Sequence, residues 1–589
     1  MTTVQVLFPV LRGTRRFHIQ KGRRWSVIEH LLLDVVSREP GTATDFAAKS
    51  GLPRRVIVEA FIRLMRAGWV EIGVVQESLI FRATPLGMEQ ASLDDLPTAT
   101  VTEAKKRGFI IEQITGGVFR SRELDVRANH LLPIPSDVEL VVQLPEATQP
   151  ADAHPSEVFT AIEGEDELIV GVDPGDDRLG KSHAVVTVRD GVIEGLPARA
   201  SPALRSLVLA EASKALEAAQ ARKAAKKPKS ASASAEALAV AAPEPSPSRP
   251  ALFDHDDLIV DGAAHRSALE RTVRSAQSRI IIHSTFVTDA AANAVLPLLQ
   301  QAAARGVLID LLWGQDEIGT STSASQEAAH RLKGKIAETG RSDSIRVHRF
   351  STHSHAKVIV ADNGRGRWQA VLGSCNWLAS NFESFEASVR LRDPALVGEL
   401  ICKLAQLACG RPGIWNELAV EMTVLGRQVK SGVRGNGRTV PMRLLFAADH
   451  ARLTLEARDR ARKRIFVLSH RLGISGRPVA LLPLLAAVKK NDIEAVAYFG
   501  RTTGLLSGVA GADLTREFAA HGVNIIPVHQ PRLHAKVLGW DDDALAVTSL
   551  NWLSADPPDL AVNREIGILI EAPRIADNFI RVFDNAHID

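Results

Sequence analysis

Short apolar runs alternate with longer helical stretches through residues 253–589. An apolar run at 279–284 precedes a helical stretch at 293–305, and a similar run at 464–469 precedes another helical stretch at 479–490. Apolar runs of this length are typical of buried strands. Strands that alternate with helices predict right-handed crossovers and a mainly parallel sheet covered on both faces.

The same order of elements occurs twice in this region. The first copy covers residues 253–410, the second covers 441–589, and residues 411–440 join them. An internal repeat of this length predicts two similar structural units. We expect two α-β-α sandwiches related by a pseudo-two-fold axis, with their corresponding strands facing one another.

The pattern is different in residues 1–95. Apolar positions at helical spacing and Pro53 predict three helices, and two strand-like runs after them predict a hairpin. Three helices followed by a two-stranded wing resemble a winged helix-turn-helix domain. That resemblance implies duplex binding, with Arg54, Arg55 and Arg63 of the third helix as candidate contacts. The alternative is a protein-docking module whose arginines only solvate the helix.

Residues 96–210 are acidic and rich in strand-like runs, which Gly and Pro interrupt. This pattern predicts a small α+β or β-rich domain. Its acidic clusters at 163–167 and 173–177 lack calcium-loop spacing, so we interpret them as a solvated face rather than a cation site. The domain is a candidate docking surface for a protein partner. Residues 211–252 are low in complexity and predict a flexible linker.

Composition and charge exclude several classes of protein. The 589 residues carry a formal net charge of only +3, so any surface that binds nucleic acid must be local. The three cysteines, Cys375, Cys402 and Cys409, cannot form a disulfide framework and lack zinc-type spacing. No apolar run has the length of a membrane span or the pattern of a signal peptide. We therefore expect a cytoplasmic protein without membrane insertion.

Two nearly identical motifs carry the candidate chemistry. Each contains His-Ala-Lys, an aspartate five residues beyond the lysine, a Ser-x-Asn segment on the next predicted strand and a later glutamate. The two sets are His355, Lys357, Asp362, Ser374, Asn376 and Glu386, and His534, Lys536, Asp541, Ser549, Asn551 and Glu565. Alternation along a strand places the histidine and the lysine on the same face. The sets therefore predict two halves of one phosphate-handling site within a single chain, without a need for dimerisation.

The paired HxKxxxxD motifs resemble those of the phospholipase D superfamily of phosphodiesterases, although Thr548 stands where that family usually has glycine. The resemblance implies that the lysines and asparagines bind phosphate, with the serines in support, and that the aspartates are structural. It implies His355 as nucleophile and His534 as general acid, each oriented by a glutamate, with no metal and no cofactor. The expected fold is multidomain α/β: a duplicated phospholipase D-like sandwich behind a winged-helix domain and a small α+β or β-rich domain.

Four other histidines lie close to the motifs in the sequence. They are His283, His348, His353 and His470. We expect ordinary surface or strand-end residues, although His283 and His470 lie near the ends of corresponding strands and could line the cleft.

The resemblance leaves the substrate open. The winged helix, the basic linker, the hairpin tip with Arg365 and Arg367, and the glycine-rich joint with Arg434 favour nucleic acid, with DNA ahead of RNA. We therefore expect a nuclease recruited by its N-terminal domain. One alternative is a cytosolic phospholipase or transphosphatidylase that uses the winged helix for docking. Another is a DNA-binding protein with an inactive catalytic domain, which two intact motifs disfavour. By analogy alone, a reader domain, a linker and a nuclease also occur together in bacterial defence systems.

Overall fold

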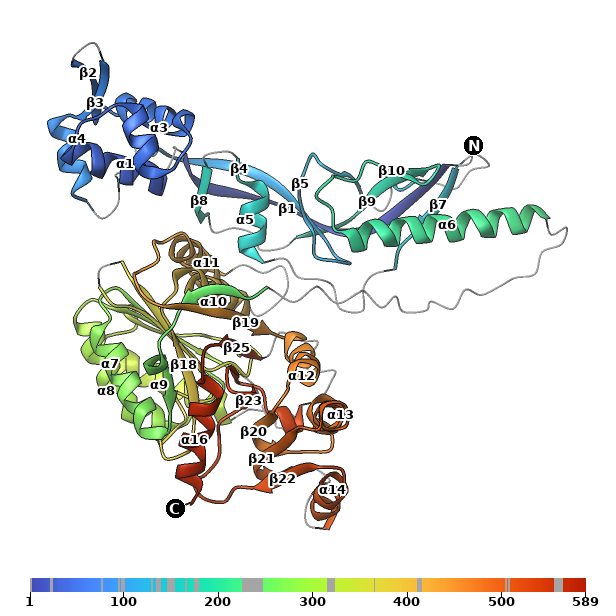
Figure 1. The fold of residues 1–589 in the computed structure, drawn as a ribbon. Coiled ribbons are helices and arrows are strands. Elements are labelled where there is room, and N and C mark those ends of the chain that lie inside the picture. The colour runs from blue at the N-terminus through green and yellow to red at the C-terminus, as the bar shows by residue number, and fades with distance from the viewer. Residues whose placement is uncertain are drawn as a thin grey trace.

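Three parts make up the molecule: a small helical part near the N-terminus, an elongated middle sheet, and a C-terminal body built on two more sheets (Figure 1). The computed structural model describes residues 3–588 except 22–24, 76–77, 94–95, 97–100, 129–130, 134–138, 146–153, 165–166, 174–178, 225–246, 315–323, 365, 410–415, 504–505, 507–508 and 556–564. Arg365 and most of the predicted linker therefore lie outside the described residues.

The middle sheet is organised around β1 (Thr3–Lys21), a strand of 19 residues. The other strands of this sheet are β4 (Val101–Glu112), β5 (Val118–Arg120), β6 (Asp125–Arg127), β7 (Glu139–Gln143), β8 (Glu167–Val172), β9 (Gly180–Arg189) and β10 (Val192–Glu194). Helix α6 (Pro202–Ala224) covers the core at one end of the sheet, and α5 (Pro155–Ile162) covers the core at the other end.

This arrangement corrects the predicted boundary of the 1–95 domain. Residues 3–21 pair with strands of the predicted 96–210 domain instead of joining the helices that follow them. The physical reason is burial, because Val4, Val6 and Phe8 are completely buried and need both the neighbouring strands and α6 to cover them.

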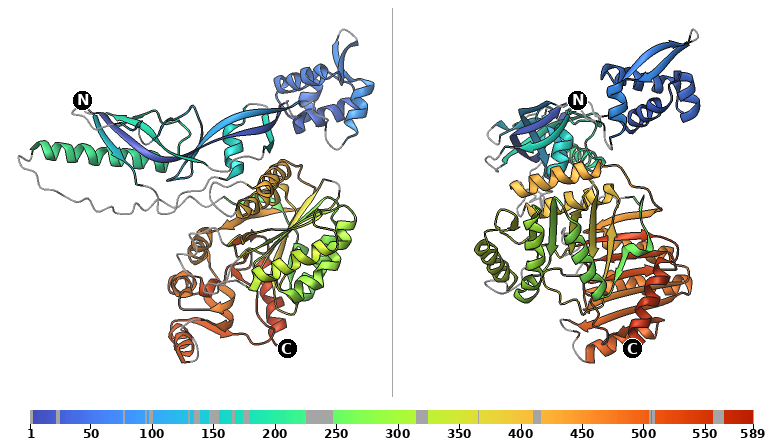
Figure 2. Two further views of the ribbon diagram at one scale, coloured as in Figure 1. Left: turned by 180° about the vertical axis from the view of Figure 1, so that it is seen from behind. Right: turned by 90° about the vertical axis from the view of Figure 1, so that its left-hand side faces the viewer.

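The N-terminal helical part has three helices and a hairpin, in the predicted order. Its elements are α1 (Val27–Arg38), α2 (Ala43–Ser50), α3 (Arg54–Arg66), β2 (Val70–Val75), β3 (Ser78–Ala83) and α4 (Pro85–Ala91). Ser26 and Thr42 begin the first two helices with capping boxes. Phe61 of α3 stacks on Phe81 of β3, with ring centroids 4.3 Å apart, and so fixes the hairpin to the helices. The part extends beyond one end of the middle sheet (Figures 1 and 2).

The two sheets of the C-terminal body have the same strand order. The first runs β12-β18-β17-β16-β13-β14-β15, and the second runs β19-β25-β24-β23-β20-β21-β22 with β11 at its outer edge. The strands of the first sheet are β12 (Leu258–Val260), β13 (Arg279–Ser284), β14 (Leu308–Trp313), β15 (Ile345–Val347), β16 (Val358–Asp362), β17 (Trp368–Gly373) and β18 (Ala387–Leu391). Those of the second are β11 (Arg249–Leu252), β19 (Thr439–Phe446), β20 (Arg464–Leu472), β21 (Glu494–Thr502), β22 (Val523–Pro527), β23 (Val537–Trp540), β24 (Ala544–Thr548) and β25 (Ile566–Glu571).

Both sheets are mixed, so the prediction of mainly parallel sheets is wrong. Only the three strands at one end of each order are parallel, whereas the motif strands β16 and β23 pair antiparallel on both sides. Short turns join β16 to β17 and β23 to β24, and a turn of that length can connect only antiparallel strands. Strand β11 also shows that residues 249–252 belong to the second sheet and not to the predicted linker.

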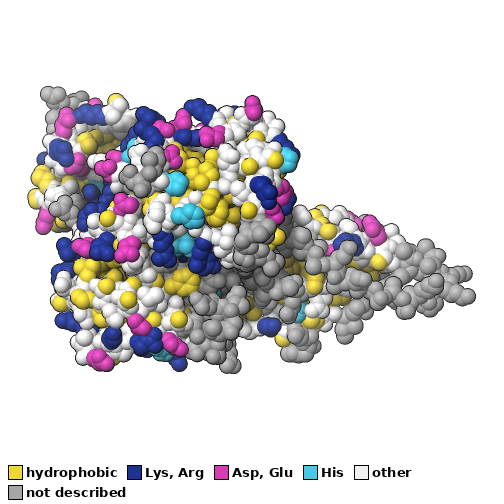
Figure 3. Space-filling view, turned by 90° about the horizontal axis from the view of Figure 1, so that it is seen from below, with side chains coloured by type: hydrophobic (Ala, Val, Ile, Leu, Met, Phe, Trp, Pro, Cys, Tyr) yellow, Lys and Arg dark blue, Asp and Glu magenta, His cyan; other side chains and the backbone are white. Residues whose placement is uncertain are grey.

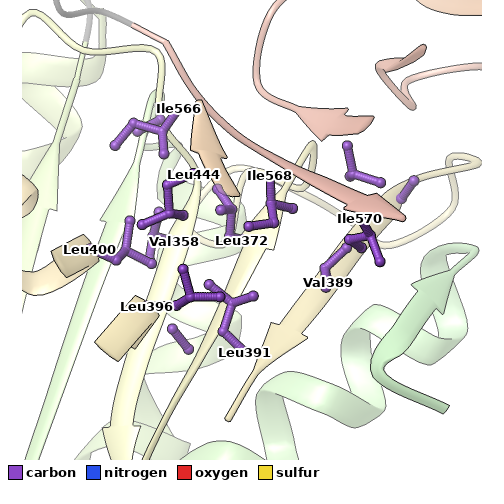
Figure 4. Packing of buried hydrophobic residues seen from close by; sticks show 14 of the residues in the cluster. Val358, Leu372, Val389, Leu391, Leu396, Leu400, Leu444, Ile566, Ile568 and Ile570 are labelled. Atoms are coloured by element: carbon purple, nitrogen blue, oxygen red, sulfur yellow. The ribbon is translucent and has the colours of Figure 1, made fainter. Parts of the chain in front are cut away.

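The core lies in three layers because neighbouring residues of each strand point to opposite faces. Ile280 and Ile282 face the outer helices of the first sheet, whereas Ile281 belongs to the cluster between the sheets. The outer helices are α7 (Gly262–Ser275), α8 (Asp289–Ala304) and α9 (Ala324–Glu338) on the first sheet, and α12 (Asp449–Arg460), α13 (Leu482–Asn491) and α14 (Val509–Ala519) on the second. Residues of both sheets, of α10 (Pro394–Ala408) and of α16 (Ile575–Ile588) form the inner cluster, part of which is shown in Figure 4.

Helix α11 (Glu417–Lys430) lies within the predicted 411–440 connection and fixes the middle sheet to the body. Its Arg427 forms an ion pair of 2.5 Å with Glu163 and lies over the ring of Phe159, 5.7 Å from the centroid. Glu167 pairs with Arg107 at 2.7 Å. The interpretation of 163–167 as a solvated face is therefore wrong for these two glutamates, because each is held in an ion pair with limited exposure.

Candidate active site

The two motif histidines lie in extended segments that lead into β16 and β23. Nδ1 of His355 lies 3.1 Å from Oε1 of Glu565, and Nδ1 of His534 lies 2.8 Å from Oε1 of Glu386. The pairing is crossed: each glutamate immediately precedes a strand of one sheet and holds the histidine of the other. An imidazole whose Nδ1 donates to a carboxylate keeps its Nε2 lone pair free for chemistry.

Backbone hydrogen bonds hold the two sheets together at this point. The carbonyl oxygen of Phe385 accepts from the amides of His534 and Ala535 at 3.0 and 2.8 Å, and the amide of Phe385 donates to Arg532 at 2.9 Å. Nδ1 of His355 also lies 3.0 Å from the carbonyl oxygen of Ser549. The relative position of the histidines is therefore set by main-chain contacts as well as by the carboxylates.

The two lysines are completely buried and differ in their partners. Nζ of Lys357 donates to Oγ1 of Thr285 and to the carbonyl oxygen of His355, both at 2.7 Å. Nζ of Lys536 donates to the carbonyl oxygen of His534 at 2.8 Å and lies 3.4 Å from Nε2 of the same histidine. Burial lowers the pKa of Lys536 to about 8, and burial together with Lys536 lowers the pKa of Lys357 well below its usual value. An anion bound beside these ammonium groups would relieve that cost.

The carboxylates are ionised and the imidazoles are neutral at pH 7. Burial alone would raise the pKa of Glu386, but attraction to His534 and a hydrogen bond from it lower that pKa to about 2. His355 acts in the same way on Glu565, whose pKa is also about 2. Burial lowers the pKa of His534 to about 4 and lowers that of His355. Both histidines are thus prepared as bases.

The two motif serines form hydrogen bonds with the two motif glutamates. The hydroxyl of Ser374 donates to Glu386, and that of Ser549 donates to Glu565. Each hydroxyl also accepts from a backbone amide, that of Ala387 at 3.0 Å in the first case and that of Ile566 at 3.1 Å in the second. Both serines are fully buried. They hold the glutamates in position, and the predicted support of the phosphate would be indirect, through these carboxylates.

The asparagines and aspartates of the motifs have contrasting environments. Oδ1 of Asn376 and of Asn551 is buried, and the described residues offer it no hydrogen-bond partner. A buried carbonyl oxygen without a partner is costly, and only a hydrogen-bond donor can satisfy it. Asp362 instead accepts from the amides of residues 277–279, and Asp541 from those of residues 462–464. Each aspartate fixes the turn that leads into β13 or β20, away from the histidines.

Thr285 was not identified from the sequence, whereas His470 was named as a residue that could line the cleft. Thr285 follows Ser284 at the end of β13, and His470 follows Ser469 in β20, so the register of the sheets makes them equivalent. Nδ1 of His470 donates to the carbonyl oxygen of Leu533 at 2.8 Å, and its ring lies 4.9 Å from that of His534. The shared serine before each position was the available signal.

Of the remaining histidines, His283 differs most from expectation. His283 is not a surface or cleft residue: it is fully buried, and its ring nitrogens lie 2.7 Å from the carbonyl oxygen of Ala356 and from Oγ1 of Thr352. Burial lowers its pKa to about 3. Nε2 of His348 lies 3.0 Å from the carbonyl oxygen of Ala408. His353 is exposed.

Thr548 stands where the family usually has glycine, and the residue opposite it on the next strand is a glycine. Thr548 pairs across the strands with Gly567, and the corresponding pair in the first sheet is Gly373 with Ser388. A Cβ on Gly567 would lie 2.8 Å from Cβ of Thr548, and one on Gly373 would collide with Ser388. Each pair therefore holds a single hydroxyl, which contacts the ring of His450 at 2.7 Å or of His265 at 2.8 Å. The hydroxyl therefore comes from a different strand in each half, but it contacts the ring of a histidine in both.

The candidate nucleic-acid contacts fall into two groups. Arg54, Arg55 and Arg367 are exposed. Arg63 pairs with the buried Glu29 at 2.6 Å, and Arg434 pairs with the buried Asp393 at 2.7 Å. These two arginines neutralise buried carboxylates, and their contact with nucleic acid stays a prediction. On one face of the molecule, histidine side chains gather near the middle, with lysine and arginine side chains beside them (Figure 3).

Comparison with known proteins identifies the domain. A family model described as "Cardiolipin synthase, PLD-like domain" matches residues 269–408. Residues 269–408 therefore match a domain of the phospholipase D superfamily. No curated protein matches the chain.

Several solved structures are similar at low identity. Phosphatidylserine synthase of Haemophilus influenzae is 11% identical over 58% of this chain and 87% of its own, with a TM-score of 0.40. Polyphosphate kinase of Porphyromonas gingivalis is 13% identical over 56% of this chain and 49% of its own, with a TM-score of 0.33. NucT of Helicobacter pylori is 10% identical over 25% of this chain and 94% of its own, with a TM-score of 0.20. These likenesses are too distant to indicate a substrate.

Two further observations concern only the described part of the chain. No helix there is both long and apolar enough to cross a membrane. No group of three or more His, Cys, Asp or Glu side chains there is arranged to hold a metal ion.

Proposed function

We propose that this protein is a metal-independent phosphodiesterase that cleaves nucleic acid, with DNA as the favoured substrate. The observation that carries the proposal is the crossed pair of His–Glu contacts beside two buried lysines. Two neutral imidazoles and two ammonium groups in a buried site suit a phosphodiester, whose non-bridging oxygens need positive charge as the transition state forms.

The reaction has two steps. Nε2 of one histidine attacks phosphorus, the bond to the leaving alcohol breaks, and the opposite histidine, protonated when the anionic substrate binds, gives its proton to the leaving oxygen. In the second step that histidine takes a proton from water as the water attacks phosphorus. The N–P bond breaks and a phosphomonoester is released. Lys357 and Lys536 neutralise the oxygens, and the amides of Asn376 and Asn551 complete their contacts.

We assign recruitment to the N-terminal helical part, which we interpret as a winged helix. Arg54 and Arg55 at the start of α3 are exposed and have the position of recognition-helix contacts. The hairpin gives no such support: Val74 and Leu79 lie opposite each other and are 70% and 61% exposed, and Arg82 is paired with Glu71. An apolar wing suits docking to a protein. The second candidate function, a phospholipase or transphosphatidylase that docks through this part, rests on that observation.

A substrate panel in excess EDTA tests the proposal. Single- and double-stranded DNA, RNA and phosphatidylcholine vesicles are incubated with the wild type and with His355→Ala and His534→Ala. We expect chelator-resistant cleavage of DNA that both variants lose. Release of head groups with every nucleic acid left intact would establish the phospholipase instead.

A further inference from the structure

A cavity of about 810 Å³ opens between α7, α8 and the segment at 379–383. Arg532, from the loop that precedes His534, closes it on the side of the second sheet. The cavity is therefore formed by both sheets, as the catalytic centre is.

Hydrogen bonds connect the wall of this cavity to three motif residues. The carbonyl oxygen of Asn376 accepts from the amides of Ala379 and Ser380 at 3.1 and 2.8 Å, so the 379–383 segment continues directly from that asparagine. The same segment leads through Phe385 to Glu386. Arg532 lies two residues before His534, and its carbonyl oxygen accepts from the amide of Phe385 at 2.9 Å. The cavity wall is therefore joined through the main chain to residues of both motifs.

The lining combines apolar residues with three arginines, Arg266, Arg274 and Arg532, and two glutamates, Glu270 and Glu383. Val295, Leu298 and Phe382 supply the apolar surface. Arg266 donates to the carbonyl oxygen of Asn381 at 3.0 Å and lies over the ring of Phe382, 5.5 Å from the centroid. Arg532 is exposed, and no ion pair or side-chain hydrogen bond of its guanidinium occurs among the described residues. A free cation facing an apolar wall suits a ligand with one anionic and one flat apolar part.

We infer that this cavity is a subsite for the nucleotide next to the scissile phosphate, with Arg532 on the flanking phosphate and the Leu298–Phe382 wall against the base or sugar. The inference rests on the proposed nuclease function and names the part of the substrate that the site would hold. A strand of nucleic acid carries a second phosphate one nucleotide from the first, whereas a phospholipid carries a single phosphodiester. The unpaired Arg532 therefore favours the polymer.

The test compares a polymer with a minimal substrate in EDTA. Cleavage of a single-stranded DNA oligonucleotide and hydrolysis of bis(p-nitrophenyl) phosphate are measured for the wild type, for Arg532→Ala and for Leu298→Glu, which places a negative charge on the opposite wall. The matched control is Arg516→Ala, an exposed arginine of α14 that pairs only with Asp513 on its own helix. We expect both cavity variants to raise KM for the oligonucleotide by about 10-fold and to weaken its salt dependence, with a much smaller effect on bis(p-nitrophenyl) phosphate.

Failure of the proposed subsite and failure of the proposed nuclease function give different results in this test. If the wild type hydrolyses neither substrate, the proposed function fails. If it cleaves both, and Arg532→Ala and Leu298→Glu change the two activities equally or match Arg516→Ala, the subsite is refuted. If the cavity variants instead reduce head-group release from phosphatidylcholine vesicles, the cavity holds a lipid. Two variants on opposite walls keep the result interpretable should one of them fold poorly.

Discussion

The two halves of the catalytic centre have the same reactive groups on different supports. Lys357 rests on the hydroxyl of Thr285, whereas Lys536 lies near its own histidine, with His470 at the position equivalent to Thr285. The hydroxyl that contacts a buried histidine ring comes from Ser388 in the first half, where the ring is His265, and from Thr548 in the second, where the ring is His450. The histidines, lysines, asparagines and glutamates are the same in both halves, but the residues that hold them are not.

The comparison shows which parts of the site the chemistry restricts. On the proposed function, the histidines, lysines and asparagines contact the phosphate and have no substitute of equal geometry, which accounts for their identity in both halves. Supporting groups need only fill a volume and satisfy a hydrogen bond, so they can be exchanged in pairs, as Gly373–Ser388 and Thr548–Gly567 are. The unequal supports also give the two histidines unequal surroundings, and this difference can divide the roles of nucleophile and acid between them.

Replacing the histidines one at a time is expected to have the largest effect. His355→Ala and His534→Ala should each reduce kcat for DNA by about 10⁴-fold or more, because both are needed in both steps. Bis(p-nitrophenyl) phosphate separates them, since p-nitrophenolate leaves without a proton. The variant that lacks the acid should still form phosphohistidine from this substrate, as detected by mass spectrometry, and the variant that lacks the nucleophile should not. Equal labelling of both variants would mean that the halves are interchangeable.

The glutamates should have the next largest effect, and it should cross between the halves. Glu565→Gln removes the charge that orients His355, and Glu386→Gln removes the charge that orients His534. Each should lower kcat by about 10² -fold, because the carboxylate fixes the imidazole tautomer without contacting phosphorus. Each glutamate orients the histidine of the other half. The glutamate variant that loses phosphohistidine labelling should therefore be the one whose partner histidine, in the opposite half, is the nucleophile. A loss that follows the histidine of the same half would contradict the crossed pairing.

The pH dependence tests the unequal lysines. In the free enzyme, His534 gains a proton as the pH falls through about 4, and Lys536 loses one as it rises through about 8, so kcat/KM should decline on both sides of that range. His470→Thr gives the second half the hydroxyl that the first half has. A hydrogen bond to the ammonium form raises the pKa of a lysine. The decline of kcat/KM at high pH should therefore move to higher pH in this variant. A decline that stays in place would show that Thr285 and His470 are not equivalent supports.

The smallest effect is expected from exchanging the hydroxyl beneath the second half. Thr548→Gly removes the partner of His450 and should lower the free energy of unfolding by about 1–3 kcal/mol, as measured by chemical denaturation. The double variant Thr548→Gly/Gly567→Ser has the same glycine–serine pair as the first half and should recover most of the lost stability. The matched control is Gly567→Ser alone, which brings two side chains into one space and should destabilise the protein.

Some of this structure was available from the sequence and some was not. The spacing of His355, Lys357, His534 and Lys536 predicts two half-sites, because histidine and lysine two apart on an extended chain share a face. The crossed pairing was not predictable: 210 residues separate His355 from Glu565, and nothing local records which sheet packs against which. Strand β1 was misplaced for the same reason, since its partner β9 lies far along the chain. Arg63 and Arg434 show that an arginine in a sequence does not reveal the carboxylate it neutralises.

The crossed pairing has a consequence for synthesis in the cell. A ribosome that has passed His355 and Lys357 has made a complete first motif, yet the carboxylate that orients this histidine is 210 residues away in the chain. Until Glu565 has emerged and the second sheet has folded against the first, His355 has no base to fix its tautomer. On the proposed function, we expect an unfinished or prematurely terminated chain to lack the activity that depends on an oriented His355.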